Sequence, residues 1–170
     1  GKGRFALLPK EQCGPLSDAG MITGADWVSD GKGGSTIIVV GDWMAPRQFT
    51  WNKNKFTEVS TSLSGMQGWW QTVTAEDLDG DGDDDLVLGN LGGNFYLKPD
   101  SSGPVKLWIN SFSQSMIPEK IITRTIDKKD VPVFLKRELT DQIPTLKKKN
   151  LKHQDYGNKS IQELFDAEMI

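Results

Sequence analysis

The stretch that decides the fold is Asp77-Leu78-Asp79-Gly80-Asp81-Gly82-Asp83-Asp84-Asp85, which continues directly into Leu86-Val87-Leu88-Gly89-Asn90. Its first nine residues fit the pattern D-x-D-x-D-G-x-x-D. Carboxylates at alternating positions, followed by a glycine that lets the chain curl back, are typical of a loop that surrounds Ca²⁺ with six to eight oxygen ligands. The apolar run that follows predicts a buried β-strand.

The spacing assigns a role to each acidic residue of this loop. We predict that Ca²⁺ is held by the main-chain carbonyl of Asp83 and by the side chains of Asp77, Asp79, Asp81 and Asp85, with water completing the shell. The side chains of Asp83 and Asp84 are expected to point outward. Magnesium is less suited because it requires a small octahedral shell, and transition metals favour His or Cys.

The charge of the chain is distributed unevenly around this loop. Glu76 to Asp85 contains seven acidic residues and no base, so the decapeptide carries −7 while the whole chain carries −3. Packed carboxylates repel one another, and a folded site that holds them close normally contains a cation. An EF-hand would need a bidentate Glu at loop position 12, which is Leu88 here. A solvated acidic turn remains the alternative without a metal.

Composition excludes several other classes of site. Among the 170 residues there are one cysteine, Cys13, and one histidine, His153, so an internal disulfide and a zinc site built from several Cys and His residues are impossible. The longest apolar run, Ile37 to Val40, is far too short to cross a membrane. Glu58, Glu76 and Asp42 are candidate catalytic carboxylates, but nothing in the sequence pairs them across a cleft, and we predict that the protein is not an enzyme.

Two apolar runs 48 residues apart indicate a repeat. Ile37 to Val40 ends in Gly41-Asp42, and Leu86 to Leu88 ends in Gly89-Asn90, so that Gly41 aligns with Gly89 without a gap. Further strands are expected at 47–51 and 94–98. A strand, a loop, a buried strand and an outer strand at this spacing are the layout of a β-propeller blade.

The remainder of the chain predicts a less regular third unit and a helical end. A strand is expected at 105–109 and a hairpin from 121–126 and 131–135 across the turn 127–130. Helical spacing relates Leu139, Ile143 and Leu146, and then Ile161, Leu164 and Phe165, with Asn158 or Ser160 as a cap. The predicted domains are therefore propeller-like blades over 1–138, with repeats at 20–66, 67–104 and 105–138, and a Lys-rich helical tail over 139–170.

The residues from Trp69 to Asn94, with the acidic loop at their centre, resemble FG-GAP/VCBS repeats of bacterial secreted proteins and integrin α-chain propellers. The wider chain is similar to exported VCBS-repeat proteins of Bacteroidetes type, and the stretches that carry this resemblance are 41–44, 55–59, 68–70, 142–149 and 161–165. The resemblance implies a β-propeller with calcium in the loop between a blade's first two strands, used for binding and not for catalysis, and export from the cytoplasm to the periplasm, cell surface or extracellular space. At about 40 to 50 residues per blade, the chain length predicts a mainly β fold of about three propeller blades, followed by the helical C-terminal tail. We expect that a signal peptide has been removed and that a lipid anchor is one means of attachment in the full-length protein.

Two other loops depart from the repeat pattern. In the first repeat, the four ligand positions align with Ser29, Gly31, Gly33 and Ile37, and in the third, Ser111 and Ser113 stand where aspartates would be expected. We therefore predict a metal in only one repeat of three. A closed propeller needs at least four blades, so we expect either a fragment of a longer protein or an open propeller that self-associates through its sheet edges.

These features predict a non-catalytic interaction module for a protein or glycan partner, with Ca²⁺ stabilising one blade loop. The alternative is a carbohydrate-binding module of an exported glycan-handling protein, in which Trp69 or Trp70 stacks on a sugar ring. We expect at most one of these two adjacent side chains to be exposed. The basic run of Lys147, Lys148 and Lys149 with Lys152 lacks any nucleic-acid motif, so nucleic acid is not a predicted partner.

Overall fold

The computed structural model describes residues 3–99, 103–113, 115–149 and 152–170. The chain divides into two compact units, Gly1–Asn94 and Phe95–Ile170. The expected boundary between residues 138 and 139 falls inside the second unit, within helix α2 (Lys136–Gln142), because Leu139 shares one hydrophobic core with Ile121 of the preceding sheet. The two antiparallel sheets of the molecule are not closed into a ring.

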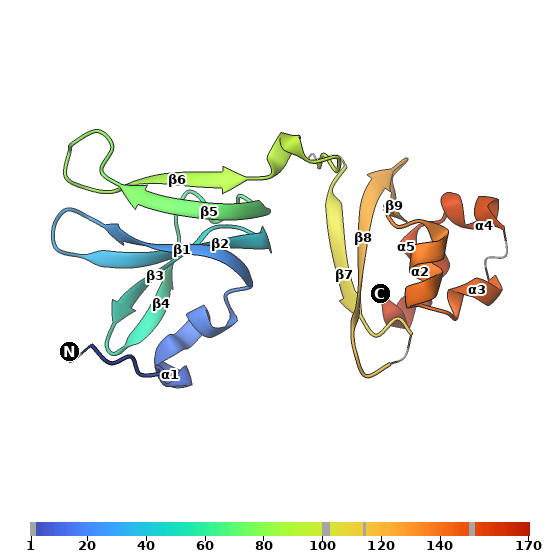
Figure 1. Ribbon diagram of the computed structural model, residues 1–170, viewed down its shortest axis with the longest axis horizontal. Coiled ribbons are helices and arrows are strands. Elements are labelled where there is room, and N and C mark those ends of the chain that lie inside the picture. Colours follow the sequence, from blue (N-terminus) through green and yellow to red (C-terminus); the bar gives the residue numbers. More distant parts are fainter. Residues whose placement is uncertain (1–2, 100–102, 114, 150–151) are drawn as a thin grey trace. The chain divides into compact units, whose positions relative to one another are not determined.

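The first unit contains six strands and three short helices (Figure 1). All of its strand pairs are antiparallel, in the order β4-β3-β2-β5-β6, and β1 also pairs with β2, from Ser35 to Asp42. The elements are α1 (Lys10–Cys13), η1 (Gly14–Asp18), β1 (Met21–Ser29), β2 (Ser35–Met44), β3 (Arg47–Asn52), β4 (Lys55–Val59), β5 (Gly68–Glu76), β6 (Asp85–Asn90) and η2 (Gly92–Asn94).

Strand β2 is the centre of this unit because it is buried on both faces. Ile38 and Val40 pack on one face with Trp70 and Val73. Val39 packs on the other face, in a cluster with Ala19, Met44 and Phe49. A strand covered on both sides needs consecutive apolar residues in place of alternation. The strands predicted from the apolar runs at 37–40 and 86–88 and from residues 47–51 are confirmed as β2, β6 and β3.

The hairpins β1–β2 and β5–β6 are built alike, but their second strands align one residue away from the expected register. The bulge lies between Ile22 and Gly24 in β1 and between Trp70 and Thr72 in β5, an offset of 48 residues in both cases. Their partners across the hairpin are 40–41 in β2 and 89–90 in β6, an offset of 49. Since neighbouring residues of a strand face opposite ways, this slip matches buried Ile38 with exposed Val87, not with Leu86.

The outer strand predicted at 94–98 is wrong. The chain leaves β6 through the short helix η2 and has no strand over 95–99. Gly92 adopts a φ of +44°, and the amide of Asn94 donates to the carbonyl of Leu91 at 3.0 Å. The Gly92-Gly93 pair therefore makes a tight turn where the repeat pattern predicts an extended strand.

The second unit packs short helices on one side of a three-stranded sheet (Figure 1). The expected strand at 105–109 is confirmed as β7, and the hairpin that follows turns over two residues, Asp127 and Lys128, at φ +48° and +65°. Strand β9 thus begins and ends earlier than the predicted 131–135. The elements are β7 (Val105–Asn110), β8 (Glu119–Ile126), β9 (Lys129–Pro132), α2, α3 (Leu146–Lys149), α4 (His153–Gly157), α5 (Ile161–Leu164) and η3 (Ala167–Met169).

The core of the second unit joins the sheet to the helices. It contains Phe112, Ile121, Leu139, Ile143, Leu146, Tyr156, Ile161, Leu164 and Phe165. The Tyr156 hydroxyl donates to the carbonyl of Phe134 at 2.8 Å, and burial raises the pKa of Tyr156 to about 12. Of the two residues predicted to cap the last helical segment, Asn158 and Ser160, Ser160 is the N-cap of α5. Its amide donates to the Glu163 carboxylate at 2.7 Å.

Candidate metal centre

The acidic loop lies at the tip of the β5–β6 hairpin. Glu76 and Asp85 are the last paired residues of the two strands, and they enclose the eight residues 77–84. The strands are firmly positioned, because Val73, Leu86 and Leu88 pack against Ile38 and Val40 of the neighbouring hairpin. The sheet therefore holds both ends of the loop in place.

The backbone of the loop folds around its own carboxylates. Asp77 accepts the amide of Gly80 on Oδ1 at 2.7 Å and the amide of Gly82 on Oδ2 at 3.1 Å. Asp85 Oδ2 accepts the amide of Leu78 at 3.2 Å. Gly80 and Gly82 have φ values of +80° and +98°, which L side chains rarely adopt, so the two glycines permit the curl that brings these amides inward.

Three of the predicted ligands converge. Asp77, Asp79 and Asp85 each offer a carboxylate oxygen, and these oxygens lie within 4.8 Å of one another. All three residues are exposed. Asp81 is outside this group, although its Oδ1 accepts the amide of Asp83 at 3.1 Å, next in the loop. A donor set made only of carboxylate oxygens fits a hard cation such as Ca²⁺ and does not suit a metal that prefers nitrogen or sulfur.

The carboxylates of the loop repel one another. The pKa of Asp83 is raised, chiefly by the negative charge of Asp81, with a hydrogen bond to Asp81 and the charges of Asp85 and Asp79 adding to it. The loop thus holds more negative charge than its own amides neutralise. A bound cation would relieve this repulsion.

Asp84 does not point outward as predicted. Its Oδ2 accepts the amide of Ser29 at 2.6 Å, and its own amide donates to the carbonyl of Ser29 at 3.1 Å. Ser29 is the last residue of β1, so this reciprocal pair joins the acidic loop to the first hairpin. The two loops also meet at Gly31, where an added Cβ would collide with the carbonyl of Gly82. The 48-residue repeat predicts that the loops of successive hairpins lie in equivalent places, and this is the only sequence signal for the contact. No local motif marks Asp84 for this role.

The loop of the first hairpin has a different chemistry. It contains one carboxylate, Asp30, whose Oδ1 accepts the amides of Lys32 at 2.9 Å and Gly34 at 2.7 Å. These two bonds lower the pKa of Asp30. By the observed hairpin register, Thr36 corresponds to Asp85, in place of the expected Ile37. Ca²⁺ takes six to eight oxygen ligands, and one carboxylate that already accepts two amides of its own loop does not provide such a site.

The two tryptophans proposed for sugar stacking are engaged in packing. Trp70 is buried at 9% exposure and donates its indole N–H to the carbonyl of Met66 at 3.0 Å. Trp69 packs edge-to-face on Trp43, with ring centroids 5.0 Å apart. Trp70 therefore has no free face for a sugar ring, and Trp69 is half-buried.

Two of the three carboxylates considered for catalysis, Glu58 and Asp42, are tied to structural partners, and Glu76 lies at the end of β5 beside the acidic loop. Glu58 accepts two hydrogen bonds from the guanidinium of Arg47, at 2.7 Å and 2.6 Å. This pairing lowers the pKa of Glu58. Asp42 accepts the side-chain amide of Gln71 at 2.8 Å. The structure uses these groups to join neighbouring strands and turns.

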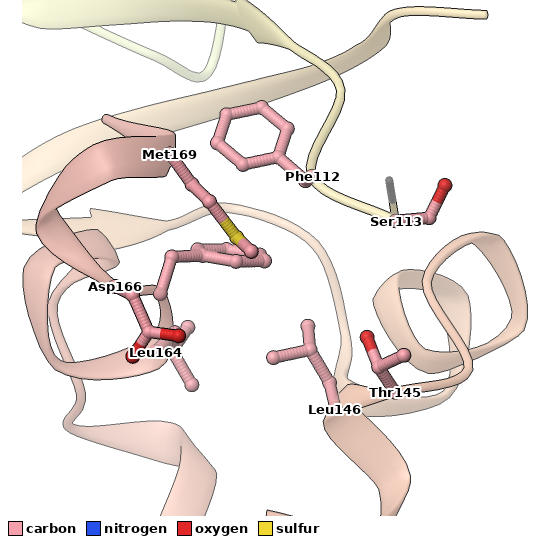
Figure 2. A pocket seen from close by; sticks show the side chains of 8 residues that line it. Phe112, Ser113, Thr145, Leu146, Leu164, Asp166 and Met169 are labelled. Atoms are coloured by element: carbon pink, nitrogen blue, oxygen red, sulfur yellow. The ribbon is translucent and has the colours of Figure 1, made fainter. Parts of the chain in front are cut away.

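A small pocket lies in the core of the second unit. Figure 2 shows Phe112, Leu146, Leu164 and Met169 around it, with Ser113, Thr145 and Asp166 also lining it. Its volume is about 170 Å³, below the roughly 300 Å³ at which ligand pockets begin. Because Phe112, Leu146 and Leu164 belong to the core of this unit, we interpret the pocket as a packing gap.

Comparison with known proteins identifies the region that carries the repeat. Residues 30–88 match the family model described as FG-GAP-like repeat. No curated protein and no solved structure matches the chain. Within the residues described above, no helix has the length and apolar character needed to cross a membrane. The matched region begins in the loop of the first hairpin and ends in β6, so it includes the acidic loop. Residues 30–88 therefore contain an FG-GAP-like repeat.

Proposed function

We propose that this protein is a repeat-based interaction module whose acidic loop binds Ca²⁺ as a structural ion. The observation that carries the proposal is the convergence of the Asp77, Asp79 and Asp85 carboxylates to within 4.8 Å. The proposed shell also includes the side chain of Asp81 and the main-chain carbonyl of Asp83. Water would supply the remaining ligands of a six- to eight-coordinate shell.

The ion would act on stability and not on a substrate. Several carboxylates around one Ca²⁺ leave little open coordination, and the cation would offset the repulsion that raises the pKa of Asp83. At a free concentration one hundred times the dissociation constant, binding to the folded state alone stabilises it by about 2.7 kcal/mol. The loop would then hold the β5–β6 hairpin, and through Ser29 also the β1–β2 hairpin.

The interaction role rests on the FG-GAP-like repeat of residues 30–88. We propose that the hairpins are parts of propeller blades and that the module binds a protein partner without catalysis. We also propose that the protein is exported. Calcium sites of extracellular modules bind weakly, with dissociation constants of about 10⁻⁴ to 10⁻³ M, and such sites fill only at the high calcium concentrations found outside the cytoplasm.

Calcium binding is tested by calorimetric titration and thermal unfolding of the chain, first stripped with EDTA. We expect a saturable calcium signal and a melting temperature that rises when calcium is restored. Asp79→Asn removes one of the converging carboxylates and is expected to weaken binding by at least about tenfold.

The matched control for this test is Asp83→Asn, which removes the same charge from a side chain outside the converging group. It is expected to retain binding. Equal losses in both variants would show only diffuse attraction to an acidic loop, and the absence of any saturable signal in the unmodified chain would sink the calcium proposal.

A further inference from the structure

A cleft of about 480 Å³ opens on the second unit, among the short helices α2, α3 and α4. The residues that line it are Lys136, Arg137, Thr140, Asp141, Lys147 and His153. All six are polar or charged, none is aliphatic, and the only ring among them is the imidazole of His153. Three permanent cations and one imidazole thus share the cleft with a single carboxylate.

The surrounding sequence strengthens the positive charge. Residues 136–153 contain six Lys and Arg residues and two acidic residues, giving +4 with the histidine neutral. By the same count, residues 95–170 carry +3, whereas residues 1–94 carry −6. The cleft is therefore the most basic part of a chain that is acidic in total.

The acidic residues near the cleft do not neutralise it. Arg137 Nε lies 3.7 Å from Asp141 Oδ2, with the two side chains 89% and 60% exposed. An exposed pair of this kind contributes little to stability, so the guanidinium can exchange this partner for another anion. Glu138 instead accepts the amide of Leu135 at 2.8 Å and caps α2. Lys147 makes no ion pair within the described part of the chain.

We propose that this cleft binds a phosphate or sulfate group carried on a polar molecule. The planar fork of Arg137 and the point charge of Lys147 are suited to tetrahedral oxyanions, and His153 adds an N–H donor. The cleft is larger than one such anion, so the remainder of the ligand would also lie inside it. Since no aliphatic side chain and no Phe, Tyr or Trp lines the cleft, that remainder is expected to be polar, such as a sugar ring.

This site is separate from the acidic loop and does not depend on calcium. It is tested on the full chain by NMR titration with inorganic phosphate, inorganic sulfate and glucose 6-phosphate, each at constant ionic strength maintained with chloride. We expect saturable shifts confined to the amides around the lining residues. Tighter binding of glucose 6-phosphate than of inorganic phosphate would identify an ester as the ligand, whereas equal binding would identify the free anion.

Lys147→Glu should lower the affinity about tenfold or more, because it replaces an attraction by a repulsion. Lys120→Glu is the matched control: it makes the same charge change in the same unit, at an exposed position of β8 outside the cleft. Arg137→Gln provides a second, milder variant, and dispersed spectra of each variant verify folding.

Three results would overturn the proposal. They are shifts that do not saturate, equal losses in Lys147→Glu and Lys120→Glu, and a DNA duplex that displaces glucose 6-phosphate at equal phosphate concentration. The first two would reduce the cleft to a diffuse positive field, and the third would assign it to nucleic acid.

Discussion

The loops of the two hairpins occupy equivalent places in successive repeats, and in each of them one aspartate accepts two backbone amides, yet the loops differ in length and charge. The first loop has five residues, 30–34, and is closed by one carboxylate that accepts two backbone amides. The second has eight residues, 77–84, and is crowded with carboxylates. A short, glycine-containing loop of this repeat can thus be closed by the hydrogen bonds of a single carboxylate. The added length and charge of the second loop are the features on which the proposed Ca²⁺ site depends.

The strongest way to break the pairing of the loops is at Gly31. Gly31→Ala would place a Cβ against the carbonyl of Gly82 at a φ of +62°, and we expect it to lower the free energy of unfolding by about 2–4 kcal/mol. Gly33→Ala is the control, since Gly33 has a φ of +90° with open space around it and should show only the backbone cost of about 1–2 kcal/mol. Urea unfolding measures both, and equal losses would mean that the loops do not touch in solution.

A smaller effect is expected at Asp84. Asp84→Ala removes the acceptor for the Ser29 amide and should lower the free energy of unfolding by about 1–2 kcal/mol. Asp83→Ala removes an equal charge from the same loop without touching the first hairpin, and relief of repulsion should leave stability unchanged or slightly raised. Chemical denaturation of the two variants in EDTA compares them without metal. A loss in Asp83→Ala as large as that in Asp84→Ala would contradict the assigned contact.

Asp30 in the first loop should make the free energy of unfolding depend on pH. Two amides lower the folded pKa of Asp30 below its ordinary value of 3.8, so its ionised form stabilises the fold above that pH. This contribution is lost as the pH falls through the lowered folded pKa. The stability difference between the unmodified chain and Asp30→Asn should therefore shrink below about pH 4. Denaturation midpoints measured from pH 6 to 3 provide the check, and a constant difference would refute it.

The smallest effect is expected for Asp30→Asn on calcium binding. If only the second loop binds the ion, calorimetry of the unmodified chain should give one calcium per chain, and Asp30→Asn should have the same stoichiometry and affinity. Two ions per chain, or a loss of binding in this variant, would show that the first loop also contributes a ligand.

Much of the fold could be predicted because the decisive signals were local. The strands expected at 37–40 and 86–88 were confirmed as β2 and β6. Asp77, Asp79 and Asp85 lie close together, and their role as metal ligands stays a prediction. The outer strand at 94–98 failed because the Gly92-Gly93 turn overrides the repeat. The role of Asp84 was missed because its partner is 55 residues away in the sequence, beyond any local motif.

Strand β2 has a consequence for how this protein could be monitored. It pairs with β1, β3 and β5, and it is covered on both faces. A strand in this position has no way to open alone, so its amide protons should exchange with solvent only when the whole first unit unfolds. The slowest-exchanging amides of β2 therefore report global unfolding of the first unit. The faster exchange of either loop can be compared with them in the same sample.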